Sequence, residues 1–126
     1  MKRYDKGRSL IRKNRFMRAL KKEEQELISF MLKDNKEFEY FITHQLTHSK
    51  VEEMNDGNMG SLKFLSVKNI KSKMKEEIAR IDLHDIDGIP LSITLNINTD
   101  NELYELDIFK GDFSPLKKFP VTPYIL

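Results

Sequence analysis

The chain has 126 residues, of which 39% are hydrophobic and 33% charged, and it contains no cysteine. This length fits one domain large enough to bury a core, and the composition excludes an intrinsically disordered chain. The lack of cysteine excludes disulfides, thiolate metal sites and nucleophilic thiols. The net charge of +2 is unevenly divided, because residues 1–22 hold ten Lys or Arg and one acid (10 − 1 = +9), which leaves 12 − 19 = −7 for residues 23–126.

The N-terminal segment is basic but has no apolar run of the ~7–15 residues that a secretory signal needs. No stretch of the chain approaches the ~18 apolar residues of a membrane span. We therefore expect a cytoplasmic protein without a membrane segment, forming a single domain over residues 1–126 in which 1–17 are a basic N-terminal extension. Nucleic-acid binding through this arm is a secondary expectation, because only Tyr4 and Phe16 could stack on bases.

Apolar residues in the first half of the chain follow helical spacing. They predict a helix over about 22–33, with Glu23 and Glu24 favourable in its first turn, and another helix before it, from about residue 8. The i, i+3, i+4, i+8 spacing of a further set predicts a short helix next, through Phe38, Phe41, Ile42 and Leu46.

From Lys50 onward the apolar residues alternate with polar ones, which is typical of strands in an antiparallel sheet with one buried face. The clearest strand runs from Ile89 to Asn98, and Asp-Gly turns separate it from its neighbours. Its two faces are expected to divide cleanly, with Ile89, Leu91, Ile93, Leu95 and Ile97 packed against Leu27, Ile28, Met31 and Leu32, and with Ser92, Thr94, Asn96 and Asn98 in solvent. We predict an α+β fold in which N-terminal helices pack on an antiparallel meander of about four or five strands.

Two loops have compositions that suit ligand binding. The Asp56–Ser61 loop is Gly-rich and offers Asp56, Gly57, Met59 and Gly60, but it lacks the Lys-Ser/Thr of a phosphate-binding loop and precedes a strand. The Asp85–Gly88 loop resembles part of a calcium loop, through Asp85 and Asp87, but lacks the downstream glutamate. Tight turns are the simpler interpretation of both.

Two further pairs of side chains have the spacing of chemical sites. His44 and His48 would face the same way on a helix, as zinc ligands do, but no third ligand is evident. Glu105 and Asp107 lie on one side of a predicted strand, roughly 7 Å apart, as paired catalytic carboxylates can. Surface histidines and solvated acids are the simpler interpretation, and we expect neither a metal nor a cofactor.

Several segments together resemble a family of small, mainly bacterial proteins, a domain of unknown function with Asp-Gly-Gly-Met-Gly-Ser-Leu and Asp-Phe-Ser-Pro-Leu motifs. The segments that carry the resemblance are Arg18–Leu20 with Glu23-Glu24, Val51–Leu62, Asp85–Pro90, Tyr104–Lys110 and Asp112–Leu116. The chain has Asn58 where that pattern has Gly, and Phe109 where it has Trp. In the last motif we expect Phe113 and Leu116 to be packed and Pro115 to end the strand ladder.

Small size, an acidic sheet half and the lack of a cofactor motif favour a non-enzymatic domain that binds a basic partner protein. An immunity-type partner of a bacterial toxin is the most concrete form of this hypothesis. The expected acidic surface includes Asp85, Asp87, Glu105, Asp107 and Asp112. These acids could instead be solvated strand ends, or the chain's own basic arm could cover them. The alternative is a small-ligand-binding or enzymatic domain that uses the Asp56–Ser61 and Asp85–Gly88 loops, which a shared concave pocket would favour.

Overall fold

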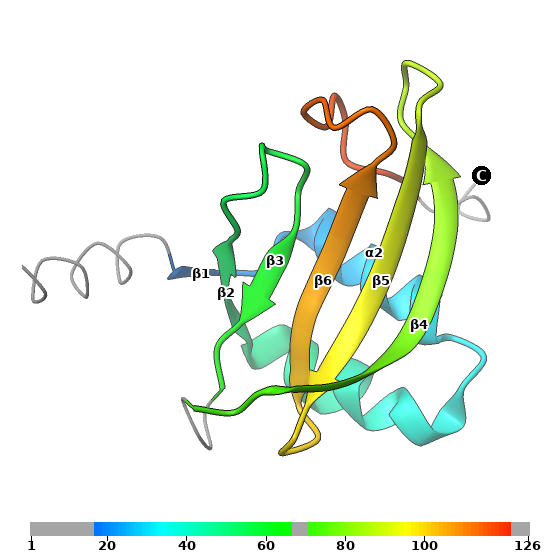
Figure 1. The fold of residues 1–126 in the computed structure, drawn as a ribbon. Coiled ribbons are helices and arrows are strands. Elements are labelled where there is room, and N and C mark those ends of the chain that lie inside the picture. Colours follow the sequence, from blue (N-terminus) through cyan, green and yellow to red (C-terminus); the bar gives the residue numbers. More distant parts are fainter. Residues whose placement is uncertain (1–16, 67–70, 122–126) are drawn as a thin grey trace, which may run out of the picture.

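The computed structural model describes residues 17–66 and 71–121. Within these ranges six strands form one antiparallel sheet, in the order β1-β2-β3-β6-β5-β4 (Figure 1). The strands are β1 (Met17–Ala19), β2 (Lys50–Glu53), β3 (Leu62–Phe64), β4 (Met74–His84), β5 (Pro90–Asn98) and β6 (Leu103–Lys110). The predicted α+β class with an antiparallel sheet is thus confirmed, with more strands than the four or five expected.

The strand order differs from the simple meander that was predicted. Two meanders, β1-β2-β3 and β4-β5-β6, are joined by antiparallel pairing of β3 with β6, in which Leu62 lies opposite Leu106. After β3 the chain therefore passes to the far edge of the sheet before it returns as β5 and β6. Sequence periodicity identifies strands but does not specify which of them become neighbours.

Helices are fewer than expected, and α2 (Lys22–Leu32) is the one regular α-helix in the described residues. It begins where predicted, and the Glu24 carboxylate accepts a 2.8 Å hydrogen bond from the Lys21 amide, one of the amides that lack a partner at a helix start. Leu27, Ile28 and Leu32 are buried against the sheet, whereas Met31, also expected there, is only half-buried at the margin.

The helix expected before α2 is not found where the structure can test it. Met17–Ala19 form the strand β1 instead, with Arg18 opposite Val51 of β2, so pairing with the sheet outweighs helical spacing. The rest of that predicted helix, residues 8–16, lies outside the described residues. Met17, the last residue of the expected extension, is paired opposite Glu52.

The predicted helix around Phe41 is a series of short turns. They are η1 (Lys36–Phe38) and η3 (Leu46–His48), both 3-10 helices, and the π-helical η2 (Phe41–Gln45). Phe41 and Leu46 are buried, and the rings of Phe38 and Phe41 stack with centroids 5.8 Å apart. These turns and α2 lie on one side of the sheet, and no described element covers the other side (Figure 1).

The central strand β5 supplies much of the core. Leu91, Ile93, Leu95 and Ile97 are buried as predicted, but Ile89 precedes the strand and is only half-buried. The opposite face of β5 is also less exposed to solvent than expected, because Thr94, Asn96 and Asn98 are buried. These small side chains lie on a strand flanked by β4 and β6, and the side chain of Asn98 is held by Glu102 in the turn that follows.

The edge strand β4 is long and irregular. Its pairing with β5 shifts register between Met74 and Glu76 and again between Glu77 and Ala79. Such bulges bend a strand and interrupt its hydrogen-bond ladder.

In the described part of the chain, no helix has the length and apolar character needed to cross a membrane.

Candidate functional site

The Asp56–Ser61 loop is a tight turn held by its first side chain. The two carboxylate oxygens of Asp56 accept hydrogen bonds from the amides of Met59 and Ser61, each at 3.1 Å. Gly57 and Gly60 have positive φ angles of 78° and 100°, which glycine adopts without strain. The loop in turn fixes its neighbours, because the Ser61 hydroxyl accepts a hydrogen bond from the Ile108 amide and lies 3.2 Å from Asp107 Oδ1.

The Asp85–Gly88 turn surrounds a buried lysine. Lys110 is 0% exposed, and its ammonium donates to Asp85 Oδ2 and Asp87 Oδ2, both at 2.7 Å, and to the Pro115 carbonyl at 3.2 Å. Asp85 is itself buried and accepts further hydrogen bonds from the backbone amides of Ile86, Lys117 and Lys118. This cluster joins the β4–β5 turn, the end of β6 and the segment after it. Asp85 is therefore not part of an accessible acidic surface, as was expected, because Lys110 neutralises it in the interior.

These contacts shift the acid–base properties of the cluster. Burial alone would raise the pKa of Asp85, but the hydrogen bonds from Lys110, Lys117 and Ile86 outweigh it and lower that pKa to about 2. Burial would lower the pKa of Lys110, yet the two carboxylates raise it. Both groups stay charged over the physiological pH range.

The uncovered face of the sheet carries the other predicted acids of β6. Its charged side chains follow from the strand register: Glu52, Glu77, Asp82, Glu105 and Asp107 against Lys50, Lys63 and Arg80. Arg80 is held by Glu77 through two hydrogen bonds of about 3 Å, and Lys63 lies opposite Glu105. Partial burial, followed by the charge of Asp107, raises the pKa of Glu105. The face therefore has more acids than bases, and Asp107 is exposed on it.

The segment after β6 does not close the core in the way that was predicted. Phe113 is 70% exposed with φ of 65°, a conformation that bulky side chains rarely adopt. Its ring lies edge-on to Phe109, which is 39% exposed, with centroids 5.0 Å apart. The exposed Asp112 beside it accepts hydrogen bonds from the Ser114 amide and hydroxyl, and these lower its pKa. Leu116 does pack against the core as expected.

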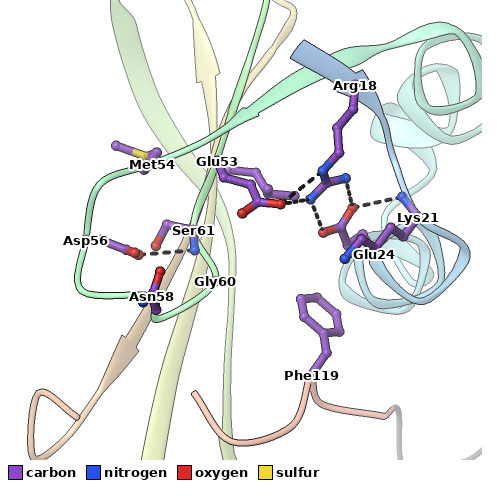
Figure 2. Close-up of a pocket in the computed structure, with 11 residues that line it drawn as sticks. Arg18, Lys21, Glu24, Glu53, Met54, Asp56, Asn58, Gly60, Ser61 and Phe119 are labelled. Carbon is purple, nitrogen blue, oxygen red and sulfur yellow. Dashed lines mark hydrogen bonds and ion pairs between the residues drawn. The ribbon is translucent and has the colours of Figure 1, made fainter. Parts of the chain in front are cut away.

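A hollow of about 170 Å³ lies next to the Asp56–Ser61 loop (Figure 2). Asp56, Asn58, Gly60 and Ser61 line one side, and an ion cluster and the Phe119 ring line the rest. In the cluster, Arg18 donates to both oxygens of Glu24, each at 2.9 Å, and to Glu53 at 3.0 Å. The hydrogen bond with Glu24 is the main reason that the pKa of Arg18 is raised. The charged groups that line the hollow are Arg18 and Lys21 against Glu24, Glu53 and Asp56, which leaves an excess of one negative charge (2 − 3 = −1).

The structure distributes the predicted site residues over three places. Asp56 and Gly60 line the hollow, whereas Gly57 and Met59 do not, and the Met59 sulfur accepts a hydrogen bond from the Lys110 amide. Asp85 and Asp87 surround the Lys110 ammonium. Glu105 and Asp107 lie on the open face of the sheet, with Asp112 shortly after the end of β6. They do not share one pocket, as the small-ligand hypothesis required. Among the residues that the structure describes, no group of three or more His, Cys, Asp or Glu side chains is arranged to hold a metal ion.

Two features were missed at the level of sequence. The Arg18–Glu24–Glu53 cluster joins residues far apart in the chain, and no local pattern predicts it. The sequence did contain a sign of the role of Lys110. It is the only Lys or Arg between Ile81 and Asp112, a stretch that includes the turn with Asp85 and Asp87. A lone cation in an acidic stretch is a candidate partner for the nearest carboxylates.

Comparison with known proteins gives one match. A family model described as a domain of unknown function (DUF6984) matches residues 17–120. No curated protein and no solved structure matches the chain.

Proposed function

The chain belongs to the DUF6984 family of domains. We propose that it is a non-enzymatic domain that binds a basic partner protein. The binding surface is the open face of the sheet, which is the face that bears Glu105, Asp107 and Phe109. The observation that carries this proposal is the face itself. One side of the sheet is covered by α2 and the short helices, while no described element covers the side that bears Glu105, Asp107 and Phe109 (Figure 1).

Charge and shape both favour a protein partner. The excess of acids over bases on this face attracts a positive surface and speeds its association. The strands present a broad surface, whereas small-molecule sites are usually concave cavities of about 300–1,000 Å³. An interface of this kind needs only a side-chain surface and no cofactor.

A nucleic-acid-directed toxin is the most concrete partner of this class, because an enzyme that binds phosphates has a basic surface that an acidic face can cover. The protein would then be an immunity-type inhibitor acting in the cytoplasm. Support for this form is the acidic face together with the small size of the chain.

Site-specific photo-crosslinking tests the proposal in cells that make this protein naturally. A photo-reactive residue at Lys63 lies on the open face opposite Glu105, and one at Glu37 lies with the helices and serves as the matched control. We expect position 63, and not position 37, to capture a protein with a basic isoelectric point. Its purified complex should weaken about tenfold or more between 0.05 and 0.3 M salt.

Asp107→Asn combined with Asp82→Asn should weaken the same complex, since both acids lie on the open face. Capture from position 37 alone, or a complex that is insensitive to salt and to both substitutions, would contradict the proposal.

The alternative function, a small-ligand site, has the hollow of Figure 2 in its favour, because four residues of the Asp56–Ser61 loop line it. A volume of about 170 Å³ suits a small polar molecule. Lys21→Trp, at a position with an ordinary φ of −74°, would obstruct this hollow while leaving the open face intact. Loss of partner capture in that variant would favour the hollow over the face.

A further inference from the structure

We infer that Phe109 and Phe113 form the anchor of this interface and that they receive an arginine side chain of the basic partner. This inference rests on the proposed function, because it names the partner chemistry at the same face. It starts from two features of Phe113 that folding alone does not explain.

The first feature is the backbone of Phe113. Its φ of 65° places an aromatic residue in the left-handed region, where the side chain crowds the following carbonyl. Glycine or asparagine would fit this position in the turn, and the other two non-glycine residues with positive φ in the described chain, Asn58 and Asn101, are both asparagine. Strain of this kind is found most often where a site requires the side chain.

The second feature is exposure. The Phe113 ring is 70% exposed and therefore gains little from hydrophobic burial, and its partner Phe109 is also open to solvent. The two rings pack edge to face with centroids 5.0 Å apart, so they form one exposed apolar surface at the end of β6. Exposed aromatic residues fixed in this way are typical of binding hot spots.

Charge around the rings selects the kind of side chain that fits. Phe109 is in register with Ser92 and, one strand further, with Asp82, while Asp107 precedes it on the same face and Asp112 adjoins Phe113. Asp112 is held ionised by Ser114, whose amide and hydroxyl both donate to its Oδ1. An aromatic platform bordered by carboxylates suits a guanidinium, which stacks flat on a ring while its edge donates to carboxylates.

Lysine fits the same place less well. Its ammonium is a compact, strongly hydrated charge that stacks poorly and cannot donate in a planar fork. The face therefore should prefer arginine over lysine, and the preference should depend on the two rings, whereas overall affinity for positive charge should depend on the acids.

The test uses the full chain with ¹³C-labelled phenylalanine rings, titrated with nona-arginine and with nona-lysine peptides at low salt. We expect nona-arginine to shift the ring signals of Phe109 and Phe113 and to bind about three- to tenfold more tightly than nona-lysine. Phe113→Gly should abolish this preference, and because glycine accepts the positive φ, its melting temperature should stay at or above that of the parent. Tyr40→Ala, which removes a 63% exposed aromatic on the helix side, should leave the preference unchanged.

The outcomes separate this inference from the proposed function. If both peptides bind the face and Phe113→Gly keeps the preference for arginine, the aromatic anchor is wrong and the acidic face remains. If Asp82→Asn with Asp107→Asn has no effect on either peptide, or neither peptide binds the face, the proposed function and the anchor both fail. A marked loss of stability in Phe113→Gly, or protection of the ring from a soluble paramagnetic agent in the free protein, would show that Phe113 packs within the chain and would overturn the anchor.

Discussion

Lys110 shows how a single side chain can determine the role of its acidic neighbours. A buried ammonium is costly unless all its donors are paired, and here the three acceptors are Asp85, Asp87 and the Pro115 carbonyl. Asp85 is equally dependent on the cluster, since its two oxygens receive the ammonium and three backbone amides. Two residues that read as surface or ligand-binding acids are thus part of the structural framework.

Asp85→Asn should therefore lower stability in a pH-dependent way. Because the folded protein lowers the pKa of Asp85 to about 2 from 3.8, ionised Asp85 stabilises the fold above about pH 4, and this contribution disappears as the pH falls toward 2. At pH 7 we expect the variant to melt about 10 °C or more below the parent, with the gap closing at acid pH. Asp87→Asn, at the more exposed of the two carboxylates, is the control and should cost less. Equal losses for both variants at every pH would show that the pairing of Asp85 is not the cause.

At the level of elements, the turns connect parts of the fold that lie far apart in the sequence. The Asp56–Ser61 loop is tied to the segment after β6, because the Leu116 amide donates to the Asn58 carbonyl at 3.0 Å. Gly60 lies at the contact, where an added Cβ would be 3.1 Å from Leu116 Cδ2 and 3.3 Å from Ile108 Cδ1. The motifs that carry the family resemblance thus meet one another at this end of the sheet.

Gly60→Ala should consequently destabilise the protein through both backbone strain and crowding, by about 2–3 kcal/mol. Gly57→Ala in the same loop is the matched control, because its φ is also positive but no atom lies within 4 Å of the added Cβ. It should cost only about 1 kcal/mol. Urea unfolding of the two variants measures the difference, and similar losses would mean that crowding at Leu116 is relieved freely.

Local patterns in the sequence predicted α2, the alternating strands and the Asp-Gly turns correctly. They failed where the outcome depends on distant residues: β1 is only three residues long and is defined by its pairing with β2. The face of β6 that bears Glu105 and Asp107 followed from alternation, but the burial of Asp85 did not, because Lys110 lies 25 positions away. Phe113 was wrongly expected in the core, since apolar character says nothing about a positive φ.

The stability of the whole molecule depends on the one side of the sheet that packs against the helical layer. Leu95 on β5 is fully buried between the helical layer and neighbouring strands, whereas Met31 of α2 lies at the margin of the same core. A domain of ordinary stability has only about 5–15 kcal/mol to lose.

Leu95→Asp should accordingly leave the chain unfolded at 25 °C, because a carboxylate would be placed in the core without a partner. Met31→Asp should remain folded with a lowered melting temperature, since its side chain can reach solvent. Circular dichroism distinguishes these results, and a folded Leu95→Asp protein would show that the face of β5 has been assigned incorrectly.

The irregular edge strand β4 has a consequence for the size of any assembly. A strand from a second molecule could follow its outer side only until one of the two register shifts, after which donors and acceptors no longer alternate evenly. Growth by pairing of a second sheet along the β4 edge is thereby interrupted. Complexes formed through the open face should therefore have a fixed stoichiometry and should not extend into fibres.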